Sequence, residues 1–141
     1  MDNKEKLRER IKSSLDNANN TLELKEKIEV EIANIMKMVT ELTDGVIEHE
    51  IRENISKLPS FHDCEKLVSL HKIVDGVPYG FTILGFSLNY SNAYPVTVET
   101  ENEIFDCQDE DALKDTIASI IDKRSLRIMQ LVSKEVPDLP F

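Results

Sequence analysis

The first part of the chain carries an apolar seam with the alternating four- and three-residue spacing of a heptad repeat. From Ile28 to Val46 every position of the seam is aliphatic, and Glu, Lys and Asn fill most positions between them. No glycine or proline precedes Gly45, so nothing in the sequence interrupts a helix. The pattern predicts a long N-terminal helix that self-associates through the seam residues Ile28, Ile32, Ile35, Val39, Leu42 and Val46.

The seam is weaker toward the N-terminus, where Ser14, Thr21 and Lys25 occupy its positions. Residues 16–20 are rich in Asn, which has poor helix propensity, and Asn20 followed by Glu23 has the spacing of a capping box. Two interpretations remain open at this point. Either one helix runs through the segment with a frayed centre, or two helices cover about 3–18 and 21–43.

Residues 46–58 fit two patterns. Ile47, Ile51, Ile55 and Leu58 follow a helical stripe, whereas the alternation from Ile47 to Ile55 fits a strand. The Glu, Arg and Asn residues in between favour a helix, which we predict here. We therefore divide the chain into a helical oligomerisation segment, 1–58, and an α+β domain, 59–141.

From Leu67 onward the chain has β character. Asp75-Gly76 is a two-residue hairpin signal between segments rich in Val, Ile, Thr and aromatic residues. We predict strands over 67–74, 79–88, 94–100 and 103–107. Because short turns join them, they should form an antiparallel meander.

A helical stripe follows Asp109, with an expected join at Lys123-Arg124-Ser125 where Ser125 caps a second helix. The tail from Val136 to Phe141 contains two prolines and should be extended. Helices packed on one face of a meander give an α+β fold.

Charge suggests a kind of partner. The chain has a net charge of −10, which disfavours direct binding to nucleic acids and anionic membranes. Between Glu99 and Asp115 only Lys114 offsets eight acidic residues. Part of this excess complements a helix dipole, and a solvated surface is the alternative interpretation. We predict an acidic patch that binds a basic protein, formed by Glu99, Glu101, Glu103, Asp106, Asp109, Glu110 and Asp111.

No motif in the sequence identifies a reaction. Glycine-rich phosphate loops and the common hydrolase signatures are absent. His62, Cys64, His71 and Cys107 lack the paired spacing of a structural zinc site, so we predict no metal, cofactor or catalytic residue. We see no secretory signal or membrane-spanning stretch, and expect a cytoplasmic protein with reduced cysteines.

These observations predict a non-enzymatic, self-associating protein that binds or inhibits a basic protein, as inhibitors, antitoxins, immunity proteins and adaptors do. Two alternatives stay open. One is a homo-oligomer that binds a small ligand between subunits, with pockets lined by Tyr79, Phe81, Phe86, Tyr90 and Tyr94. The other is a metal or thiol enzyme that uses His62, Cys64 and His71.

Overall fold

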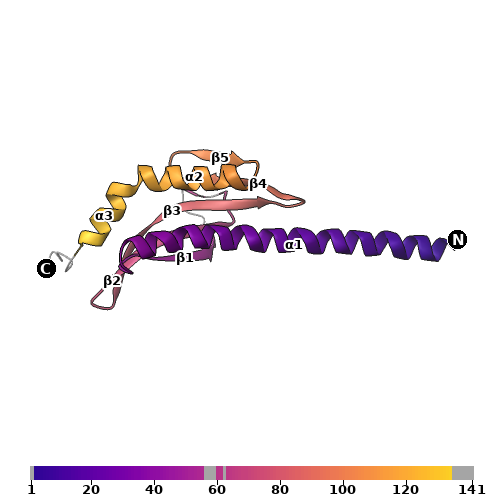
Figure 1. Ribbon diagram of the computed structural model, residues 1–141, viewed down its shortest axis with the longest axis horizontal. Coiled ribbons are helices and arrows are strands. Elements are labelled where there is room, and N and C mark those ends of the chain that lie inside the picture. The colour runs from indigo at the N-terminus through magenta and orange to yellow at the C-terminus, as the bar shows by residue number, and fades with distance from the viewer. Residues whose placement is uncertain (1, 56–59, 62, 135–141) are drawn as a thin grey trace.

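The computed structural model describes residues 2–55, 60–61 and 63–134. It shows an α+β fold, as predicted, with a long helix before the sheet and two helices after it (Figure 1). In chain order the elements are α1 (Asn3–Leu42), β1 (Glu48–Glu53), β2 (Lys66–Val74), β3 (Val77–Asn89), β4 (Ala93–Glu99), β5 (Ile104–Cys107), α2 (Glu110–Lys123) and α3 (Ser125–Ser133).

Helix α1 is continuous over 40 residues, and its Asn-rich segment does not break it. The Asp2 side chain caps its start by accepting a hydrogen bond from the backbone N–H of Lys4, at 3.0 Å. The helix ends at Leu42, and three residues later Gly45 adopts a positive φ of 78°, a conformation that glycine adopts without strain. The single-helix interpretation is therefore confirmed, and no second helix begins at Asn20.

The five strands form one antiparallel sheet in the order β1-β2-β3-β4-β5, which confirms the predicted meander. Asp75 and Gly76 make the tight turn between β2 and β3, and both have positive φ. Positive φ at both central residues is typical of a type I′ turn, whose twist matches that of the two strands in a two-residue hairpin. Local turn chemistry was therefore sufficient to locate this hairpin.

The helix predicted over 46–58 is wrong where the structure describes it, because Glu48–Glu53 forms the edge strand β1. Its register places Ile51 opposite Val68 of β2. Along β1, His49 and Ile51 are partly buried while Glu50 and Arg52 are exposed, which is the two-residue period of a strand. Pairing with β2 outweighs the helical preference of the charged residues. Residues 56–59 lie outside the described part of the chain.

All three helices contribute to one core on one face of the sheet. Ile32 and Met36 of α1 share it with Phe86 of β3, Val96 of β4 and Ile117 of α2. The core thus joins the predicted oligomerisation segment to the predicted α+β domain.

The helix join at Lys123–Ser125 is confirmed, since α2 ends at Lys123 and α3 begins at Ser125. However, Arg124 occupies the N-cap position of α3, and no side chain caps it. The Ser125 hydroxyl instead donates to the carbonyl of Asp122 at 2.8 Å. The predicted extended tail, 136–141, lies outside the described residues.

Candidate functional site

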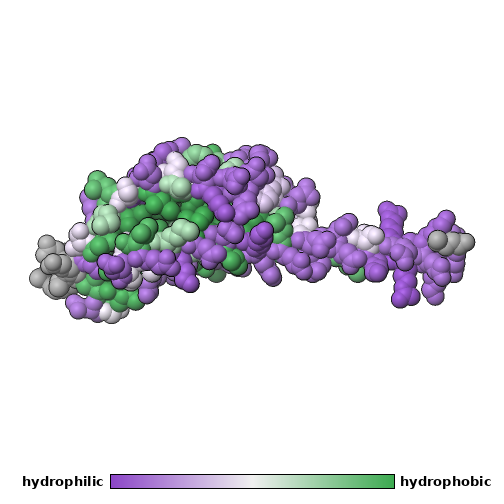
Figure 2. Space-filling view, viewed as in Figure 1, coloured by the Kyte–Doolittle hydropathy of each residue, from purple (hydrophilic) through white to green (hydrophobic). Residues whose placement is uncertain are grey.

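The N-terminal half of α1 projects beyond the sheet, as the indigo end of the helix shows (Figure 1). We call residues 3–22 the arm. Every residue from Asp2 to Asn20 is exposed. The arm is mostly hydrophilic, whereas the apolar surface gathers over the domain (Figure 2). It nevertheless carries exposed apolar residues at helical spacing: Leu7, Ile11, Leu15, Ala18 and Leu22.

The predicted oligomerisation residues lie mainly in the other half of α1. Ile28, Ile32 and Val39 are buried in the core of their own domain, and Ile35 packs against it. Leu42, by contrast, is 85% exposed at the helix end, and Val46 lies beyond the helix. Most of this seam therefore has an intramolecular partner and offers little surface to a second chain. A heptad seam and the core-facing stripe of a globular helix share nearly the same spacing.

The turn between β3 and β4 marks where the arm leaves the domain. The Thr21 hydroxyl lies 3.4 Å from the carbonyl oxygen of Ser91. One turn later, the Lys25 ammonium donates to the carbonyl of Tyr90 at 3.4 Å and lies 5.5 Å from the centre of its ring. These contacts hold the base of the arm against the sheet.

The structure does not bring the seven predicted acidic residues into one patch. Glu101 and Glu103 follow β4 and pair with basic residues of the C-terminal helices, Arg127 at 3.5 Å and Lys123 at 3.1 Å. Asp106 accepts a hydrogen bond from Thr97. Glu99 is 7% exposed and adds little to the surface.

A second acidic group lies at the opposite end of β5, where α2 begins. Asp109 caps α2 by accepting from the backbone N–H of Ala112 at 2.8 Å, and Asp111 is exposed beside it. Lys114 bridges Glu110, at 3.1 Å, and Glu31 of α1, at 3.6 Å. We call Glu31, Asp109, Glu110 and Asp111 the α2 acidic cluster.

Tyr94 of β4 lies close enough to this cluster for its pKa to be affected. Burial raises the pKa of its phenol above the ordinary value, and repulsion by Glu110, Asp109 and Glu31 raises it further. Sequence reasoning missed Glu31 because it is far from the acidic segment in the chain. It joins the cluster only because α1 packs beside α2.

The candidate metal ligands and nucleophiles do not converge among the residues that the structure describes. That part of the chain has no group of three or more His, Cys, Asp or Glu residues arranged to hold a metal ion, and His62 lies outside it. Cys64 and Cys107 are both buried, and the Cys64 thiol donates to the carbonyl of Phe61 at 3.0 Å. Burial is the main cause that raises the pKa of Cys107, which disfavours the thiolate that a nucleophile requires. His71 lies 3.5 Å from Glu48.

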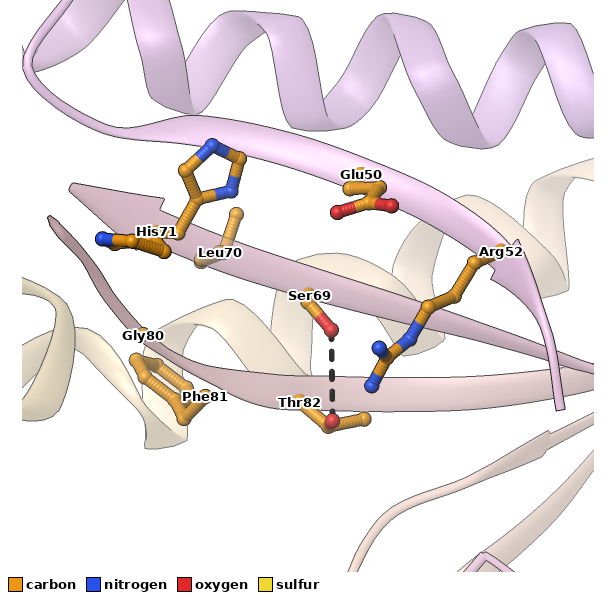
Figure 3. A pocket seen from close by; sticks show the side chains of 9 residues that line it. Glu50, Arg52, Ser69, Leu70, His71, Gly80, Phe81 and Thr82 are labelled. Carbon is orange, nitrogen blue, oxygen red and sulfur yellow. Dashed lines mark hydrogen bonds between the residues drawn. The ribbon is translucent and has the colours of Figure 1, made fainter. Parts of the chain in front are cut away.

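The sheet face away from the helices has a shallow cavity of about 280 Å³ (Figure 3). Glu50 and Arg52 project over it from β1, and the hydroxyls of Ser69 and Thr82 lie 3.5 Å apart on its floor. Its lining is mainly polar and includes only Phe81 of the five aromatic residues considered above.

The aromatic residues considered for ligand binding do not all gather at one place. Phe86 is buried in the core, whereas Tyr90 is almost fully exposed. Tyr79 and Phe81 stack under the cations of Lys134 and Arg127, at 4.7 and 4.1 Å. These two rings line one open cavity of about 260 Å³ beside α3, which the other three aromatic residues do not line.

No described helix is both long enough and apolar enough to cross a lipid bilayer. Comparisons with protein-family models, with curated proteins and with solved structures find no match to this chain. Its function must therefore be inferred from its own surfaces.

Proposed function

We propose that this protein is a non-enzymatic protein-interaction module that self-associates through its arm. The observation that carries the proposal is an exposed helix of about 30 Å, with an apolar stripe that no described residue of the same chain covers. Isolated helices of this length are marginal in water and gain stability mainly by packing an apolar face. A partner helix would supply that packing.

The self-association surface proposed here lies nearer the N-terminus of α1 than the surface predicted from the sequence. The sequence pattern predicted Ile28 to Val46, whereas the stripe from Leu7 to Leu22 has the exposed apolar side chains. Both surfaces belong to one helix, so the predicted element is kept and only its contacting residues change.

We further propose that the α2 acidic cluster attracts a basic protein, in the manner of an inhibitor or adaptor. The position of Tyr94 supports this idea. Burial is the main cause that raises the pKa of its phenol, and repulsion by Glu110, Asp109 and Glu31 adds to it, so the carboxylates of the cluster act on one point of the surface. A field of one sign steers oppositely charged partners and accelerates their association. We keep the cytoplasmic location predicted from the sequence as part of this proposal.

Native mass spectrometry of the untagged full chain tests both parts. Wild-type protein should give a mass of two or more chains of 16.1 kDa each. Leu15→Asp should return the protein to a monomer, because it places a charge in the middle of the stripe. We call residues 23–42 of α1, which pack against the sheet, its docked half. Val30→Asp is the matched control, since Val30 belongs to the docked half and is similarly exposed. A monomeric wild type at high micromolar concentration would contradict self-association.

The same measurement on protein isolated gently from its own cells tests the acidic cluster. A bound basic protein should add its mass to the wild type, and Glu110→Lys combined with Asp111→Lys should remove it. The matched control is Glu101→Lys with Glu103→Lys, which reverses the other acidic group. If that control removes the partner and the cluster variant retains it, the partner binds elsewhere.

A further inference from the structure

The charge of α1 changes along its length. Residues 3–12 contain five basic and two acidic residues, whereas residues 13–31 contain five acidic and two basic residues. All of the residues in the first group are exposed. In a chain with a net charge of −10, the tip of the arm is thus locally basic, whereas the stretch of α1 that forms its base and continues into the domain is acidic.

The apolar stripe of the arm is nearly symmetric about Leu15. Leu7 and Ile11 precede it, and Ala18 and Leu22 follow it at almost the same intervals. A second arm can therefore cover the stripe in either direction and still place apolar residues against apolar residues. The stripe favours pairing without specifying the orientation of the partner helix.

Charge distinguishes the two orientations. A parallel, in-register pair would set two basic tips side by side, and like charges repel. An antiparallel pair sets each basic tip beside the acidic base of the other arm. Exposed ion pairs are individually weak, so the apolar stripe supplies most of the affinity and charge selects the direction.

We propose that the arms of two copies pair antiparallel, with the two-fold axis near Leu15. This inference rests on the proposed self-association and adds its geometry. Leu7 of one copy lies near Leu22 of the other. At each end of the pair, Lys4 of one copy lies near Glu26 of the other, since both residues flank the stripe on the same side. Such a contact is closed and two-fold, because each arm offers the same surface to the other. The two domains then sit at opposite ends of the paired helices.

Cysteine cross-linking on the full chain tests the orientation. The probe is a thiol-reactive bifunctional reagent that spans about 8 Å, or five to six residues of helix rise. Leu15→Cys should cross-link to itself in either orientation. A mixture of Leu7→Cys and Leu22→Cys chains should give a heterodimeric product, whereas Leu7→Cys alone should give none. In the antiparallel pair, the two copies of residue 7 are about 24 Å apart along the helix axis. The wild-type chain, treated in the same way, shows whether the buried Cys64 and Cys107 give any cross-linked product of their own.

The outcomes separate this inference from the proposed function. If Leu7→Cys alone cross-links as efficiently as Leu15→Cys, the arms pair in parallel, which overturns the inference and leaves self-association intact. If Leu15→Cys gives no product and the chain has a monomeric mass, both fail. A heterodimeric product without self-linked Leu7→Cys supports both.

A charge exchange gives a second test that does not depend on cysteines. Glu26→Lys should raise the dissociation constant of the dimer about fivefold, because the new lysine then faces Lys4 of the other copy at both ends of the pair. Adding Lys4→Glu to the same chain should restore it to within about twofold. Failure of Lys4→Glu to restore affinity would overturn the antiparallel arrangement.

Discussion

The two halves of α1 share one spacing of apolar residues and lie in different environments. Residues of the docked half, such as Ile28 and Ile32, are buried against the sheet of their own chain. Leu7 and Ile11 of the arm follow the same spacing and are more than half exposed. A heptad seam therefore identifies a helix that has a packing face, but it does not identify the surface that packs on that face.

Composition explains which half docks. The seam of the docked half consists of large aliphatic residues, and Met36 beside it is completely buried in the core. The seam of the arm includes Ser14 and Ala18, whose small side chains bury less apolar area. The half of α1 that removes more apolar surface from water on packing is therefore the one that docks on the face of the sheet.

The largest contrast between the halves should appear in stability. Ile32→Ala should lower the free energy of unfolding by about 2–5 kcal/mol, because it leaves a cavity in the core. Ile11→Ala should change it by less than about 0.5 kcal/mol, because Ile11 is exposed in a single chain. Urea unfolding at a protein concentration low enough to keep the chain monomeric measures both values. An equal loss in the two variants would mean that the arm is part of the domain core.

The two N-caps give a smaller, matched contrast. Asp109 and Asp2 make equivalent hydrogen bonds, at 2.8 and 3.0 Å, at the starts of a docked and a projecting helix. Asp109→Ala should cost about 1 kcal/mol of global stability. Asp2→Ala should leave global stability unchanged and speed hydrogen exchange only in the first turns of the arm. If Asp2→Ala destabilises the whole domain, arm and domain unfold as one unit.

The smallest expected effect concerns the ionisation of Tyr94. Glu31, in the docked half, helps to raise the pKa of this phenol, so Glu31→Gln should lower that pKa. Asp16→Asn, in the arm, should leave it unchanged. An NMR titration of the Tyr94 ring in the two variants measures the difference. An equal response to both substitutions would place the arm near α2 and contradict the structure.

The same shift has a consequence for stability at alkaline pH. Because the folded pKa of Tyr94 is raised, the unfolded chain releases this proton first, from an ordinary pKa of 10.0. This group therefore leaves stability unchanged below about pH 10 and lowers it as the pH rises further. Tyr94→Phe should remove that part of the alkaline loss.

Much of the fold was predictable because its signals are local. The hairpin at Asp75-Gly76, the meander and the start of a helix at Asp109 all depend on residues close together in sequence. Strand β1 was not predictable in this way, since its composition favours a helix and its structure depends on pairing with β2. The acidic site was only partly predictable. Asp109, Glu110 and Asp111 were identified, Glu31 was missed, and Glu101 and Glu103 proved to lie at the other end of β5.

The sequence alone determined most elements of this protein, the order of the strands from β2 to β5 and the presence of a long amphipathic helix. Periodicity, turn residues and caps act over a few residues, so they can be identified without the fold. Only the tertiary structure decided that Ile28 to Val39 face their own sheet and that Glu31 stands beside Glu110. The physical reason is that apolar burial and the Coulomb interaction depend on proximity in space, and a linear pattern does not specify which surfaces come into contact.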